Sequence, residues 1–138
     1  MFERRKIENP WDGKMKPFKI IGNVYFVGTF QASSHLIDTG DGFILIDTGY
    51  ANTLDLVIES IGELGFNLKD IKYIINTHWH GDHTQGTKGM VELTGAKTLI
   101  GRYDEEKAKT FFEPDILTLP KSRFPPAHCD FRHAAVGA

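Results

Sequence analysis

Alternation of apolar and polar side chains predicts short β-strands in the first third of the chain. The segments 18–21, 24–28, 33–38 and 42–47 are rich in aromatic and β-branched residues, which favour extended structure. Gly22-Asn23 and Thr39-Gly40-Asp41-Gly42 separate neighbouring segments, and Asp and Gly tolerate the positive φ angles of tight hairpins. We expect an antiparallel meander of strands.

From residue 52 onward the apolar positions follow the period of a helix, up to Gly65, which is placed to end it. The segments 70–76 and 97–100 read as further strands. Helices are predicted over 84–94, ended by Gly95, and over 104–112, ended before Pro114. Strands that alternate with helices imply parallel pairing and a sheet covered by helices, so the fold class is α/β.

Composition limits the classes of partner. The chain has 138 residues, 41% of them hydrophobic and 25% charged, and this size supports one hydrophobic core. A formal net charge of −2 gives no positive field for nucleic acid. The apolar runs fall short of the roughly 20 residues of a membrane helix, and no export signal follows the basic start. We therefore expect a cytoplasmic protein, or the mature chain of a periplasmic or secreted one, with neither nucleic acid nor membrane as partner.

Three of the six histidines fall within the run Thr77-His78-Trp79-His80-Gly81-Asp82-His83. A strand that ends at residues 76–77 would point His78 and His80 to the same side, where they can chelate one ion. Gly81 would let the chain turn, so that Asp82 and His83 hold a second ion from the start of the next helix. Imidazole and carboxylate suit zinc better than iron or manganese. The alternative is a solvated loop that caps the helix, but capping needs one polar residue and not four at ligand spacing.

Other polar residues are assigned more modest roles. Asp82 can also accept a hydrogen bond from a metal-bound water and so is the candidate catalytic residue. Trp79 either lines a substrate pocket or packs beneath the loop. His35 is interpreted as a strand histidine and not a ligand, and Arg102 and Lys107 as surface charges.

The loop resembles the His-x-His-x-Asp-His signature of the metallo-β-lactamase superfamily. Residues 40–49 are similar to the second signature of that family, in which the residue corresponding to Asp47 lies beneath the metal site and braces the loop. Local capping of the following turn is the alternative role for Asp47. Residues 17–29 and 33–37 resemble the start of the β-lactamase subclass whose dizinc site uses only His and Asp, with no Cys.

The resemblance implies an αββα fold of which residues 1–120 form the N-terminal half, apparently truncated, followed by an irregular tail over 121–138. It also implies up to two zinc ions, the first on His78 and His80 and the second on Asp82 and His83, with a hydroxide that attacks the carbonyl of a β-lactam or another cyclic amide or ester. Quorum-sensing lactonases, glyoxalase II-like thioesterases and nucleases share the loop, so fold and metal transfer better than substrate.

Family members are much longer, and their second half supplies the remaining metal ligands. Catalytic zinc needs three protein ligands and a water, whereas the loop offers two ligands to each ion. A catalytically incompetent fragment with weak or no metal binding is therefore the competing hypothesis. A half sheet would also expose an edge and an apolar face, which predicts a homo-oligomer or a complementary fragment as partner. The tail is either irregular and solvated or a source of replacement ligands. The residues of the tail that could bind zinc are His128, Cys129, Asp130 and His133.

Overall fold

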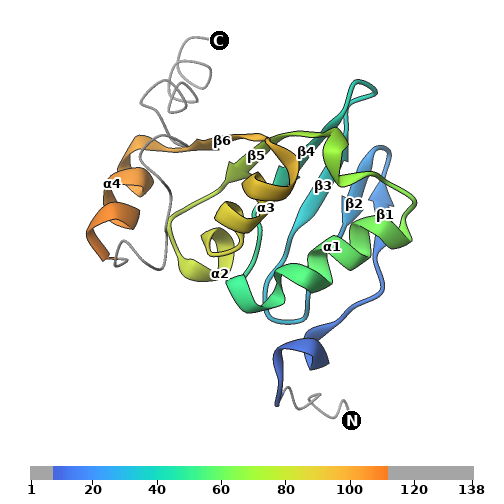
Figure 1. Ribbon diagram of the computed structural model, residues 1–138, viewed down its shortest axis with the longest axis horizontal. Coiled ribbons are helices and arrows are strands. Elements are labelled where there is room, and N and C mark those ends of the chain that lie inside the picture. Colours follow the sequence, from blue (N-terminus) through green and yellow to red (C-terminus); the bar gives the residue numbers. More distant parts are fainter. Residues whose placement is uncertain (1–7, 112–138) are drawn as a thin grey trace.

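A computed structural model describes residues 8–111 of the chain. One six-stranded sheet runs through this part in the order β1-β2-β3-β4-β5-β6, and α1 and α3 lie across it (Figure 1). The strands are β1 (Phe18–Ile21), β2 (Val24–Phe26), β3 (His35–Asp38), β4 (Phe43–Ile46), β5 (Ile71–Asn76) and β6 (Lys97–Ile100). The helices are η1 (Pro10–Gly13), η2 (Ala51–Thr53), α1 (Leu54–Glu63), η3 (Leu68–Asp70), α2 (Gly81–Thr84), α3 (Thr87–Thr94) and α4 (Arg102–Phe111).

The pairing of the strands confirms both parts of the predicted topology. Strands β1 to β4 pair antiparallel as a meander, and β4, β5 and β6 pair parallel with helices in the connections. The observed strands lie within the predicted segments and are up to two residues shorter at an end, since β2 ends at Phe26 and β3 begins at His35. The α/β fold class is confirmed.

The hydrophobic core lies between the sheet and the two helices α1 and α3. Leu36, Leu45 and Ile74 are direct neighbours in adjacent strands and are fully buried. They belong to one cluster with Val57 and Ile61 of α1 and Met90 of α3. Burial of these side chains, each worth about 1.5–3 kcal/mol, fixes the helices on this face.

The opposite face of the sheet is also apolar. Ile37, Ile44 and Tyr73 are paired neighbours that form one row across it, Ile37 and Ile44 are half-buried, and Tyr73 is 41% exposed. Phe18, at the β1 edge, is 47% exposed. The described part of the chain therefore presents the partly exposed apolar face that the sequence predicts.

The single helix predicted over 84–94 is wrong, because the structure divides this segment into α2 and α3. The break is at Gly86, whose amide donates to the carbonyl of Gly49 at 3.0 Å. A Cβ atom at position 86 would lie 2.7 Å from the carbonyl oxygen of Thr48. Contact with the chain that follows β4 therefore overrides the helical period. The other predicted helices shift by a few residues: η2 precedes α1, and α4 begins at Arg102.

No helix among residues 8–111 is long and apolar enough to cross a membrane. The four candidate ligands of the tail, His128, Cys129, Asp130 and His133, and the proposed boundary at 120/121 lie outside the described residues.

Candidate metal centre

The histidine-rich loop lies at the carboxyl ends of the parallel strands. Residues 77–80 connect β5 to α2, Asp47 follows β4, and α4 follows β6. Because parallel strands share a direction, these three connections lie together at the carboxyl-terminal end of the parallel strands (Figure 1). In open α/β sheets ligands bind at this end of the strands.

Asp47 is a buried carboxylate aimed at the loop. The residue is 4% exposed and has a φ of 60°, the one positive φ of a non-glycine residue in the described chain. Asp is among the few residues that tolerate this conformation. The Asp47 carboxylate accepts hydrogen bonds from the amide of Thr77 at 2.8 Å and from its hydroxyl at 2.7 Å. Both reach across thirty residues, so the carboxylate braces the loop, whereas local capping was the alternative.

The same carboxylate orients His83. Nδ1 of His83 lies 2.7 Å from Asp47 Oδ2, and a carboxylate can only accept, so this contact places a proton on Nδ1. Nε2 then faces the other way, 3.3 Å from Asp82 Oδ2. A histidine whose Nδ1 donates to a carboxylate while Nε2 points into a site is arranged as metal-binding histidines are.

Three side chains converge at this point. Ligand atoms of His78, Asp82 and His83 all lie within 4.8 Å of one another, and residues 8–111 hold this one group of at least three such donors. The rings of His78 and His83 are 4.0 Å apart between centroids. Two imidazole nitrogens and a carboxylate oxygen, with a coordination position left over, are the donor set of a catalytic zinc site. The residues therefore fit a zinc ion.

His80 lies beside this group and not within it. Its side chain is exposed, and its ring lies 4.8 Å from the His78 ring and 4.5 Å from the Trp79 ring. The structure thus groups His78 with Asp82 and His83, which differs from the predicted pairs. The reason is local, because β5 ends at Asn76 and strand alternation no longer orients the loop. Gly81 is the first residue of α2, without a positive φ, and Asp82 and His83 follow it in the first turn of that helix.

Sequence reasoning missed two residues that hold the loop backbone. Asp104, in the first turn of α4, accepts the amide of Trp79 through Oδ1 at 3.1 Å. Thr84 donates its hydroxyl to the carbonyls of Trp79 at 3.3 Å and of His80 at 3.1 Å. A polar residue four positions after His80 could have suggested Thr84, whereas no local pattern indicates Asp104.

A buried polar chain links the ends of β4 and β5 to α3. The hydroxyl of Thr87 donates to Asn76 Oδ1 at 2.9 Å and lies 3.0 Å from the hydroxyl of Thr48. The amide of Thr48 donates to the carbonyl of His83 at 3.0 Å. Thr48, Asn76 and Thr87 are at most 5% exposed, and their contacts fix the backbone of the candidate ligand His83.

His35 and Arg102 occupy the places assigned to them. His35 is on β3, with its ring packed edge-on against Phe26 at 5.7 Å. Arg102 is exposed on α4 and pairs with Glu106 at 3.5 Å. Neither residue belongs to the group of candidate ligands.

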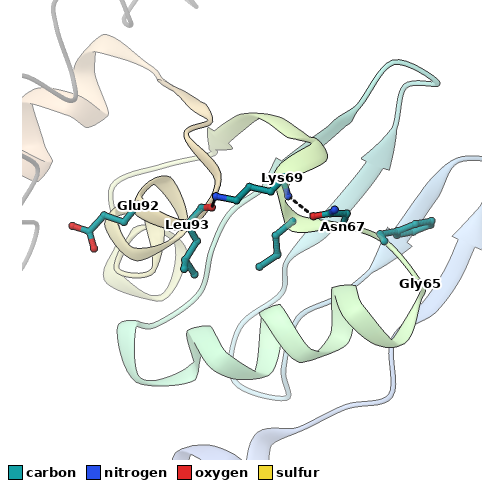
Figure 2. A pocket seen from close by; sticks show the side chains of 7 residues that line it. Gly65, Asn67, Lys69, Glu92 and Leu93 are labelled. Carbon is teal, nitrogen blue, oxygen red and sulfur yellow. Dashed lines mark hydrogen bonds between the residues drawn. The ribbon is translucent and has the colours of Figure 1, made fainter.

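A shallow pocket of about 590 Å³ lies at the other end of the parallel strands (Figure 2). It is formed by the segment 65–69, which precedes β5, and by Glu92 and Leu93 near the end of α3. The Lys69 ammonium donates to the carbonyl of Leu93 at 2.6 Å and so binds the end of that helix. None of the predicted site residues lines this pocket, so the chemistry is assigned to the histidine-rich loop.

Comparison with known proteins identifies the family of the chain. The family model described as metallo-beta-lactamase superfamily matches residues 27–136. The chain belongs to the metallo-β-lactamase superfamily. The resemblance that the loop and its flanking segments suggest is confirmed.

Solved structures of metallo-β-lactamases resemble this superfamily member. The metallo-β-lactamase SMB-1, bound to 2-mercaptoethanesulfonate, has a TM-score of 0.67 and 38% identity, with 70% of this chain and 38% of that chain covered. MEM-A1, a subclass B3 metallo-β-lactamase from a soil metagenome library, has a TM-score of 0.66 and 36% identity, with 70% and 36% covered. The beta-lactamase-like protein 2 homolog of Caenorhabditis elegans is 32% identical over 92 residues, which are 66% of this chain and 31% of that protein. The matched part is thus only 31–38% of the length of each of these relatives.

Proposed function

We propose that the chain is the metal-binding part of a zinc-dependent hydrolase that adds water to the carbonyl of a cyclic amide, in the first place a β-lactam. The observation that carries the proposal is the convergence of His78, Asp82 and His83, with His83 held by a buried carboxylate. The likeness to solved metallo-β-lactamases at 36–38% identity supports the choice of substrate.

Each residue of the centre has a distinct task. His78, His83 through Nε2, and Asp82 would hold one zinc ion, and His80 is the candidate for a further ligand or for part of a second site. When bound, zinc makes water nucleophilic at neutral pH and polarises the carbonyl under attack. Asp47 keeps the proton of His83 on Nδ1, and Asp82 offers its Oδ1 to accept a hydrogen bond from the attacking water.

The competing proposal is a fragment that binds zinc weakly and turns nothing over. The described residues converge as one group of three donors, which is enough for one catalytic ion but not for two. A third proposal, a lactonase or a glyoxalase II-like thioesterase, keeps the same centre and changes only the carbonyl substrate.

The test combines zinc content with turnover. Zinc per chain is measured by elemental analysis, and hydrolysis is followed with nitrocefin, a cyclic lactone and a thioester. We expect nitrocefin turnover that is lost with a chelator and in His83→Ala, and kept in His35→Ala, which removes an imidazole outside the centre. Turnover of the lactone or thioester alone would favour the third proposal, and zinc without any turnover the inactive fragment. A chain that binds no zinc would refute a metal-dependent function.

A further inference from the structure

We propose that Asp104 is a positioning residue that directs His80 toward the metal by holding the amide of Trp79. This inference rests on the proposed function, because His80 has a role only where the loop binds metal. The contact comes from a neighbouring strand connection: Ile100, the last residue of β6, is paired with Asn76, the last residue of β5. The first turn of α4 therefore lies beside the loop, and Asp104 Oδ1 accepts the Trp79 amide at 3.1 Å.

The loop is held at alternate amides. Asp47 accepts the amide of Thr77, which precedes His78, and Asp104 accepts the amide of Trp79, which precedes His80. The Trp79 amide belongs to the planar peptide unit that joins His78 to Trp79, so Asp104 fixes the backbone between the two histidines. The next peptide unit, which begins at the Trp79 carbonyl, leads directly to His80. Each carboxylate thus holds the peptide unit that ends at the residue before a histidine.

The Trp79 residue is held on both sides. Its amide meets Asp104, and its carbonyl accepts the Thr84 hydroxyl at 3.3 Å. Residues 77–80 lie outside the strand ladders, so these side chains do there what ladder hydrogen bonds do in β5. The position of the His80 side chain depends most on an ordered backbone, because this side chain is exposed and lies outside the group of three donors.

The experiment compares zinc affinity, measured by competition with a chromophoric chelator, in the full chain and its variants. We expect Asp104→Ala to weaken zinc binding about tenfold, at the lower end of the range for residues that support metal ligands. Asp104→Asn keeps an oxygen that can accept the amide and should restore affinity to within about threefold. Asp55→Ala is the matched control, because Asp55 occupies the first turn of α1 as Asp104 does that of α4; it should leave affinity unchanged. Urea unfolding of each variant shows whether a loss of zinc affinity comes from the missing hydrogen bond or from an unfolded chain.

A double-mutant cycle assigns the effect to His80. If Asp104 acts through His80, Asp104→Ala should cost less than about twofold in the His80→Ala background, because coupled residues are not additive. Full additivity, or wild-type affinity of Asp104→Ala, would overturn the inference. Wild-type chain that binds zinc without turnover would refute the proposed function alone, and wild-type chain that binds no zinc would refute both.

Discussion

Replacement of Asp47 by Asn tests whether the buried carboxylate sets the proton of His83. Asn has the same shape and also tolerates the positive φ of this position. Its oxygen can still accept the Thr77 amide, but an NH₂ group then stands 2.7 Å from His83 Nδ1, where Oδ2 was. Two donors cannot face each other, so the proton moves to Nε2, where Asp82 Oδ2 is 3.3 Å away and can accept it. That nitrogen is then blocked for metal.

The expected loss follows from the contacts at this position. The lost hydrogen bond to a charged group contributes about 1.5–3 kcal/mol, and the removal of a buried charge offsets part of this loss. The free energy of unfolding should therefore fall by about 2 kcal/mol. Zinc affinity should fall by about 10- to 100-fold, equivalent to about 1.4–2.7 kcal/mol. The stability and affinity losses are separate quantities, measured by urea unfolding and by chelator competition.

The assay for the proton itself is long-range ¹H–¹⁵N correlation of the histidine rings in metal-free protein at pH 8. Nδ1 of His83 should carry the proton in the wild type and Nε2 in Asp47→Asn. Asp38→Asn is the control, since Asp38 also accepts a backbone amide, that of Gly40 at 2.9 Å, but in a hairpin. Unchanged zinc affinity together with an unchanged His83 tautomer in Asp47→Asn would show that Asp47 does not orient the ligand.

Three further predictions follow from the packing. Gly86→Ala would bring a Cβ atom within 2.7 Å of a backbone carbonyl and should lower the free energy of unfolding in urea by about 1–3 kcal/mol. The control Gly62→Ala, in helix α1 with open space around it, should instead raise it by up to about 1 kcal/mol. Equal effects of the two substitutions would show that the close contact at Gly86 does not matter. Zinc should raise the melting temperature, since it binds the folded state; this rise should vanish in His83→Ala and persist in His35→Ala. The apolar sheet face should give a mass in sedimentation that rises with concentration, and Ile44→Lys should reduce the rise; a concentration-independent mass in the wild type would count against self-association.

Much of the fold could be predicted from the sequence because its signals are local. The alternating and helical periods of apolar residues locate the strands and helices within a few positions. Asp82 and His83 are neighbours in the sequence, so their convergence needs only one helical turn. Asp47 was identified through its resemblance to a family signature, and the structure supplies the contact that gives this residue a physical role.

The remaining features depend on contacts between distant segments. The break between α2 and α3 is imposed on Gly86 by contact with the chain after β4. The helical spacing of the apolar residues does not indicate this contact. The place of His80 outside the group of donors depends on where β5 ends and on how the loop packs. Asp104 belongs to another helix altogether, so no spacing within the loop indicates its contact with Trp79.

The construction of the metal centre has a consequence for the order of folding. Its bracing hydrogen bonds join residues 25, 30 and 36 positions apart, across connections between parallel strands. Such non-local pairings require the closure of long loops and form slowly. A chain in which α1 and the β1–β4 meander have already formed would still lack the centre. Zinc binding during refolding should therefore report the final registration of β4, β5 and β6, and not the earlier formation of helix.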